Sequence, residues 1–322
     1  MIMKQILLAA LAAMAITSCS QNEDIPSIGS GDAQITFNTV VNKSTRATPM
    51  VTADFASFSI YGYQTENTFD GTASLGSAFM DNVAATKEDN GTWTLAGGPY
   101  YWPLTGNMQF FAVSPADHIE AYAVGDPAGF PSFNYTIQGT QEDLLAAQTL
   151  DATKSGNAVQ LSFSHLLTQV NFSAELEENI DYEITSVKVV GVNNAGTFTY
   201  AAAKGAWSAT SGTASYEYAG NFAATPASGI VDMSTADNAL MLMPQTLPAG
   251  AKIEVTYKAT ATTGNKQVTF DGTKSVAIEN ATWTPGQNIR YKLVLPSDAQ
   301  AISFTPLVGN WDNTTDEGKN PA

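Results

Sequence analysis

Short stretches in which apolar and polar residues alternate dominate the chain. The two clearest are residues 252–260 and 288–295, in which every second side chain is apolar. A period of two places these side chains on one face of a β-strand. Further strand candidates lie at residues 34–41, 161–172, 187–192, 197–200 and 267–270, and the turn sequences between strands are Asn90-Gly91, Asn194-Ala195-Gly196, Gly264-Asn265 and Asp271-Gly272. The pattern predicts an all-β protein made of antiparallel sandwiches.

Helix signals are few and short. Ser114-Pro115 resembles an N-cap followed by proline in the first turn, before residues 118–123, and residues 141–148 could form two helical turns. A length of 322 residues fits two domains. A polar, glycine-containing break at residues 151–157 predicts a first domain over 47–156 and a second over 157–322.

Composition narrows the function. The apolar fraction of 44% supports a proper core, whereas charged residues make up only 14%. Fourteen basic against 30 acidic residues give a net charge of −16, which would be repelled by phosphate backbones, so we expect no nucleic-acid partner. One cysteine excludes an internal disulfide, and two histidines leave little for acid–base or metal chemistry. We therefore expect no cofactor, and no enzyme.

The first residues have the form of an export signal. A basic start is followed by an apolar run from Ile6 to Ile16 and by small residues before Cys19. This arrangement resembles the lipobox of bacterial lipoproteins, which predicts a signal peptide at 1–18 and a lipid on Cys19; the alternative is an ordinary signal with a free thiol. Residues 20–32 are polar, contain Pro26 and two glycines, and are typical of a flexible tether.

Several segments, in order along nearly the whole chain, resemble the fimbrillin-like family, the pilus subunits and related lipoproteins of Bacteroidales-type bacteria. The matching segments are Ile35-Thr-Phe before Thr45-Arg46-Ala47-Thr48, Tyr101-Trp102-Pro103, Phe110–Pro115, Gln141–Leu145, Leu161–Phe172, Met243-Pro244-Gln245, Trp283–Gly286 before the strand of Tyr291, and Ile302-Ser-Phe304 ahead of Trp311.

This resemblance implies two tandem transthyretin-like β-sandwiches and export to the cell outer membrane as a lipoprotein. It also implies cleavage after an arginine by a trypsin-like surface protease, loss of a first strand, and polymerisation by strand exchange. Only two arginines exist, Arg46 and Arg290. Arg46 lies in a polar, breaker-rich segment, whereas Arg290 lies inside a predicted strand. We therefore expect cleavage between Arg46 and Ala47, with residues 19–46 as tether and removable strand.

The C-terminal segment repeats the pattern of the first strand. Four apolar residues of the strand expected to be displaced (Ile35, Phe37, Val40 and Val41) align with Ile302, Phe304, Leu307 and Val308. This match makes residues 301–311 a candidate donor strand for the next subunit. Pro306 suits an edge or inserted strand, because proline cannot donate a main-chain hydrogen bond. The alternative is that Ile-x-Phe recurs by chance and that the last strand completes its own domain.

The leading interpretation is a stalk subunit of a surface pilus that serves adhesion. Its expected partners are copies of itself or related subunits, the processing protease, the membrane through the lipid on Cys19, and a host or bacterial surface ligand. The alternative is a non-polymerising surface lipoprotein that acts as an adhesin or binds glycans through aromatic residues such as Trp102 and Trp283. The structural interpretation of these two tryptophans is that they fill the cores of the sandwiches. We interpret His165 as structural, and the acidic residues at 175–181 lack the spacing of a calcium loop.

Overall fold

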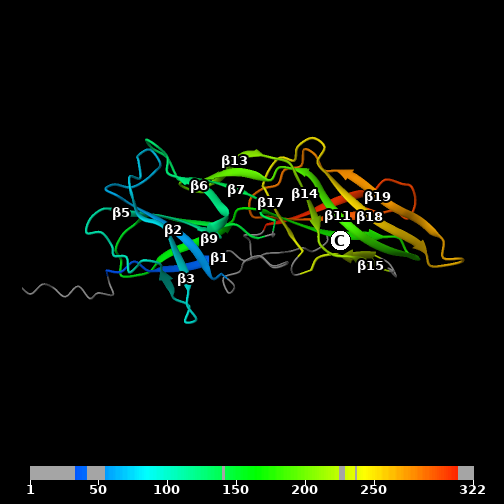
Figure 1. The fold of residues 1–322 in the computed structure, drawn as a ribbon, viewed down its shortest axis with the longest axis horizontal. Helices are drawn as coiled ribbons and strands as arrows, with labels where there is room; N and C mark the ends of the chain where they lie inside the picture. Colours follow the sequence, from blue (N-terminus) through cyan, green and yellow to red (C-terminus); the bar gives the residue numbers. More distant parts are fainter. Residues whose placement is uncertain (1–32, 42–54, 140–141, 225–228, 236–237, 311–322) are drawn as a thin grey trace, which may run out of the picture.

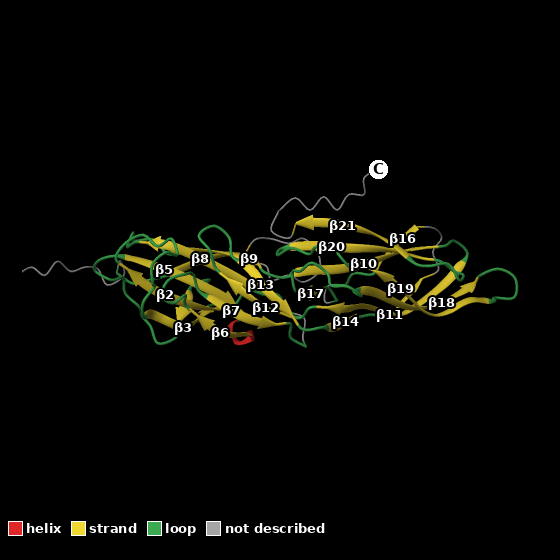
Figure 2. Cartoon of the chain, turned by 90° about the horizontal axis from the view of Figure 1, so that it is seen from above, coloured by secondary structure: helices red, strands yellow, loops and turns green. Residues whose placement is uncertain are grey.

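The computed structural model describes residues 33–41, 55–139, 142–224, 229–235 and 238–310. Nearly all regular structure in these ranges is β-strand, and the one helical turn is η1 (Ala116–His118). The strands form an elongated molecule with a lobe at each end (Figure 1, Figure 2). The predicted all-β class is confirmed.

The N-terminal lobe is built on a seven-stranded sheet with the order β1-β9-β8-β5-β2-β3-β4. Its strands are β1 (Phe37–Val41), β2 (Ser57–Thr65), β3 (Ala78–Lys87), β4 (Trp93–Leu95), β5 (Asn107–Ser114), β8 (Leu145–Ala152) and β9 (Val159–His165). The central strands bury both faces: in β5, Phe110 enters one core and Phe111 enters another. This double burial explains why β5 has a continuous apolar run instead of alternation.

The two edges of this sheet approach each other. The N–H of Ile35, just before β1, donates to the carbonyl of Tyr100, and the N–H of Trp102 donates to the carbonyl of Ala33, both at 2.8 Å. Gln34 and Tyr101 thus form an antiparallel bridge between the segment before β1 and the segment after β4. The sheet is therefore nearly closed around the core that contains Phe37 and Phe110.

A four-stranded sheet, β13-β12-β7-β6, covers the other core of this lobe. Its strands are β6 (Ile119–Ala123), β7 (Ser132–Thr136), β12 (Ala195–Thr199) and β13 (Ala206–Ser211). The β12–β13 hairpin comes from the second half of the chain and pairs with β7. It fills this core with Phe198 and Trp207, and the Trp207 indole N–H donates to the Leu166 carbonyl at 2.7 Å.

The predicted boundary between residues 156 and 157 does not separate the lobes. β9, β12 and β13 all follow it in sequence, yet all three pair within the sheets of the N-terminal lobe. The chain first leaves this lobe at Leu166-Leu167 and returns to it for the hairpin. A local polar break could not reveal this, because the hairpin is placed by distant aromatic partners on β7.

The C-terminal lobe is a sandwich of two five-stranded sheets around one core. One sheet contains β10 (Thr168–Leu176), β16 (Gly229–Asp232), β17 (Leu240–Leu242), β20 (Gln287–Leu295) and β21 (Ser303–Asn310). The other contains β11 (Ile180–Val192), β14 (Ala214–Tyr218), β15 (Phe222–Ala224), β18 (Lys252–Ala261) and β19 (Val268–Ala277). β10 and β20 are parallel neighbours, and β21 lies at the edge next to β20 (Figure 2).

The strands predicted from strict alternation are confirmed. The elements predicted from other sequence signals are only partly correct. The stretches at 252–260 and 288–295 form β18 and β20. The expected single strand at 161–172 divides into β9 and β10, because Leu166 and Leu167 turn into the N-terminal lobe. The helix expected at 141–148 is wrong, since β8 begins at Leu145. Asp271-Gly272 makes no turn and lies inside β19.

Candidate functional site

The first described strand closes one core of the N-terminal lobe. We use "seam" for residues 33–41, which pair with β9 in parallel through β1 and contact residues 100–102 through the segment before it. Ile35, Phe37 and Val41 are buried in the core. The Phe37 ring meets Phe110 edge-on at a centroid distance of 5.3 Å. Removing the seam would leave an open core between two unpaired backbone edges.

Val40 does not belong to the buried set. It is 46% exposed, because successive side chains of a strand point to opposite faces and Val41 points inward. The prediction of four equivalent apolar positions therefore reduces to three inward positions in the first strand. The second edge of the seam, at Tyr100 to Trp102, was not predicted, since its only sequence signal is a bulky aromatic cluster.

The last described strand is an edge strand with few buried side chains. β21 pairs with β20 on one side, and no strand of the described chain pairs with its other side. Ile302, just before β21, is buried, whereas Phe304 is half-buried and meets Tyr291 edge-on at 5.2 Å. Val308 is 61% exposed. Pro306 lies opposite Tyr291 on this edge, a position where a missing N–H is tolerated.

The two strands alternate in the same way. In β21, Phe304 and Val308 pair with inward-facing Leu293 and Ile289, whereas Leu307 pairs with Arg290 on the outer face. Leu307 thus corresponds to Val40, which also points away from its core. Three pairs remain equivalent in facing: Ile35 with Ile302, Phe37 with Phe304, and Val41 with Val308.

Within one chain the two strands are not neighbours. β1 belongs to the seven-stranded sheet of the N-terminal lobe, and β21 to a sheet of the C-terminal lobe. Cys19, Arg46 and Ala47, at which we expect lipidation and cleavage, lie outside the described residues.

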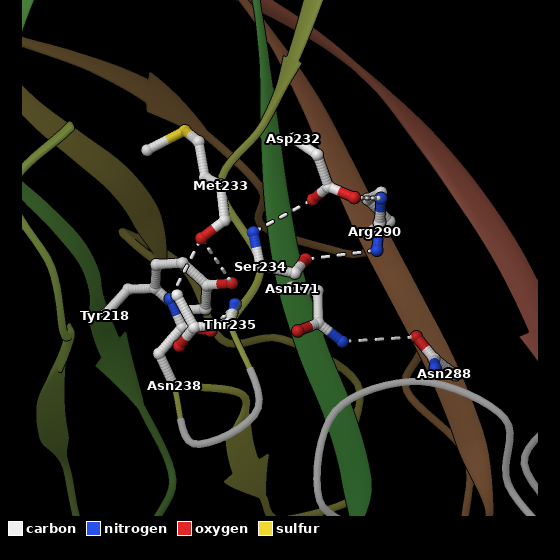
Figure 3. A network of polar contacts seen from close by, with 9 residues as sticks. All are labelled: Asn171, Tyr218, Asp232, Met233, Ser234, Thr235, Asn238, Asn288 and Arg290. Carbon is white, nitrogen blue, oxygen red and sulfur yellow. Dashed lines mark hydrogen bonds and ion pairs between the residues drawn. The ribbon is translucent and has the colours of Figure 1, made fainter. Parts of the chain in front are cut away.

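Arg290 is held inside a paired strand. β20 lies between β10 and β21, and the Arg290 guanidinium donates to Asp232 at 2.9 Å and to the Ser234 hydroxyl at 3.0 Å (Figure 3). Burial would raise the pKa of Asp232, but the Ser234 N–H and Arg290 outweigh it and hold this pKa below its usual range. A protease needs an extended, unpaired segment, so this arginine is a poor cleavage site.

Around this ion pair, polar contacts fasten the segment after β16. The Asn238 side chain donates to the Met233 carbonyl at 2.9 Å and accepts from the Thr235 N–H at 2.8 Å (Figure 3). On the neighbouring strands Asn171 donates to Asn288 at 3.5 Å. These contacts join neighbouring segments of one lobe, so we interpret the network as structural; the buried Oδ1 of Asn171 has no hydrogen-bond partner among the described residues.

The other side chains considered as candidate functional groups have structural roles. His165 is fully buried, and its Nδ1 lies 2.6 Å from Asp143 Oδ2, a partner 22 residues earlier in sequence. Trp283 is buried and Trp102 packs against Phe110, which matches the core interpretation of both. The described residues hold no group of three or more His, Cys, Asp or Glu side chains suited to a metal ion. Nor does any helix in the described ranges have the length and apolar character to cross a membrane.

Comparisons with known proteins agree with this architecture. A family model described as fimbrillin-like matches residues 45–311. A fimbrial protein from Bacteroides vulgatus superposes with a TM-score of 0.62 at 17% identity, covering 86% of this chain and 99% of that chain. A candidate cell adhesion protein from Bacteroides ovatus superposes with a TM-score of 0.51 at 16% identity, covering 86% and 97%. No curated protein matches the chain in sequence.

Proposed function

Because the chain belongs to the fimbrillin-like family, we propose that it is a stalk subunit of a surface fimbrium that polymerises by strand exchange. The family is one of fimbrial and adhesion proteins and not of enzymes. The observation that carries the proposal is the matching alternation of the first strand and the last strand. The first strand closes a core, and the last strand is a weakly buried edge.

In the proposed mechanism, a trypsin-like surface protease cuts between Arg46 and Ala47 and leaves 322 − 46 = 276 residues. The seam strand then departs and exposes a groove between β9 and residues 100–102. The last strand of a second copy, or of a related subunit, enters this groove. Main-chain pairing with the exposed edges supplies affinity, and the inward apolar side chains supply specificity.

A subunit of this kind both accepts and donates a strand. The proposed removable strand makes it an acceptor, and the proposed donor strand lets it join a further subunit. A chain limited to one of these roles would end a fibre, so the combination favours a stalk position. Any host or bacterial ligand would then meet a repeated surface along the fibre.

The experiment that tests this function is electrophoresis of surface extracts with and without boiling. Strand-exchanged subunits dissociate very slowly, so unboiled material should form a ladder of multiples that collapses to one band near the subunit mass after boiling. A single band in both lanes would contradict polymerisation and favour a monomeric, glycan-binding surface protein.

We further propose that the precursor is anchored through lipid on Cys19. Attachment of several acyl chains contributes about 0.8 kcal/mol per buried CH₂, which exceeds the single-chain limit for stable anchoring. Cys19→Ala should therefore lose palmitate incorporation and detergent partitioning. Normal labelling of this variant would exclude the lipoprotein step and leave strand exchange untouched.

A further inference from the structure

The link between β20 and β21 is held by side chains from several elements of the C-terminal lobe. This link is residues 295–300, counted from Leu295, the last residue of β20. The Tyr182 hydroxyl donates to the Leu295 carbonyl at 2.9 Å, and the Tyr257 hydroxyl donates to the Pro296 carbonyl at 2.6 Å. Both tyrosines are buried, so their positions are fixed by the core.

Two charged side chains hold the rest of the link. The Glu177 carboxylate accepts from the Ser297 N–H at 2.9 Å and from the Ser297 hydroxyl at 2.6 Å. The Lys274 ammonium donates to the carbonyl of Asp298 and, at 2.6 Å, to that of Gln300. It also lies 4.3 Å from the centre of the Phe270 ring, which fixes the lysine side chain.

The strand that follows is held differently. From Ser303 onward, β21 is attached by its ladder to β20 and by the half-buried Phe304, whereas Val308 is exposed. Every carbonyl from Leu295 to Asp298, except that of Ser297, accepts a side-chain hydrogen bond from elsewhere in the lobe. A well-held link thus precedes a weakly held strand.

We infer that Glu177, Tyr182, Tyr257 and Lys274 form a clamp that keeps residues 295–300 in place while β21 leaves its own sheet and pairs with a second copy of this chain. This inference rests on the proposed strand exchange. The clamp residues position the donor strand and do not touch the groove that receives it.

The clamp sets the length of free chain between neighbouring subunits. With the clamp closed, only Ala301 separates the fixed link from the inward-facing Ile302. With the clamp open, the six residues from Pro296 to Ala301 would act as a flexible tether with a root-mean-square span of about 13 Å. A closed clamp therefore favours a stiff joint and a single direction of departure for β21.

Hydrogen–deuterium exchange on the unassembled subunit tests the clamp directly. In the unmodified chain, the Ser297 amide, which donates to the Glu177 carboxylate, should be protected from exchange. Lys274→Met retains the aliphatic stem on Phe270 but removes both hydrogen bonds, so the link should open more often and exchange of the Ser297 amide should rise about tenfold. Lys258→Met is the matched control, because it removes the same charge from a lysine on the solvent face of β18. Equal exchange of the Ser297 amide in both variants, or a Ser297 amide that is unprotected in the unmodified chain, would overturn the clamp.

Fibre stiffness provides the second measurement. Lys274→Met fibres should bend more, with a shorter persistence length in electron micrographs than Lys258→Met fibres, while the ladder in unboiled gels stays the same. Tyr257→Phe, which removes only one hydroxyl, should shift stiffness in the same direction. Equal stiffness in all three variants would overturn the clamp. An unmodified chain that forms no fibres would instead overturn the proposed function, and the exchange measurement would still decide the clamp.

Discussion

Val308→Asp is expected to abolish polymerisation without unfolding the subunit. Val308 is exposed in its own lobe, so an aspartate there remains in water. In the proposed complex the same position occupies the inward site of Val41, which is buried. The variant would lose the burial of a valine, about 1.5–3 kcal/mol, and would also have to bury a carboxylate. We expect donor affinity to fall at least about hundredfold.

The measurement is the unboiled ladder, with a thermal melt to confirm folding. Thr305→Asp is the matched control, because Thr305 lies on the same strand and is exposed on the outer face. It should polymerise normally. Val308 is a sharper position than Ile302, since Ile302 is buried in its own lobe and an aspartate there would disturb the fold. Normal ladders from Val308→Asp would show that this donor register is incorrect.

Arg46→Gln is expected to leave a folded, exported precursor that does not accept a donor strand. The seam is paired on two sides and buries three apolar side chains, a gross stabilisation of about 5–9 kcal/mol. A strand held this firmly is rarely absent from its groove while it remains covalently attached. At 5 kcal/mol, only about one chain in several thousand would be open.

N-terminal sequencing of surface-assembled protein checks this prediction. The mature subunit should begin Ala47-Thr48-Pro49, and the Arg46→Gln variant should give no such product. Lys43→Gln is the control, because it removes the other basic residue of the same segment. It should be cleaved and should polymerise as before. A mature end at Ser44, or fibres from the Arg46→Gln variant, would place the activating cut elsewhere.

The sequence predicted those elements whose burial is one-sided. β18 and β20 each bury one face, so their period of two is explicit. β10 is buried on both faces: Gln169 and Asn171 lie on one face and Phe172 lies on the other. The residues of β10 therefore do not alternate clearly between apolar and polar, and the sequence did not show where this strand begins. The short Leu144-Leu145 pair resembled a helical turn, although both leucines are buried by distant partners.

The sequence indicated that the first and last segments are strands, but it did not indicate their geometry. The apolar repeat identified the first and last strands, but the facing of Val40 and Leu307 depends on which neighbours each strand pairs with. The edge at residues 100–102 pairs with Ala33 and Ile35, more than sixty positions away, and no local pattern reports such a contact. The clamp is similar, because its residues come from separate elements and meet only in the folded lobe.

The parallel pairing of β10 with β20 has a mechanical consequence. Tension along a fibre would enter the chain at β9, pass through Leu166-Leu167 into the start of β10, and leave through the end of β20 toward the donor strand. Pulling two parallel strands from opposite ends loads the ladder from Gln169–Asn288 to Leu176–Leu295 in shear, so all its hydrogen bonds resist together instead of opening one after another. β1 is also parallel to β9, so a donor strand that enters in the same direction would meet the same geometry at the junction between subunits. A fibre built in this way would resist stretching most strongly along its own axis, the direction in which flow pulls on an attached cell.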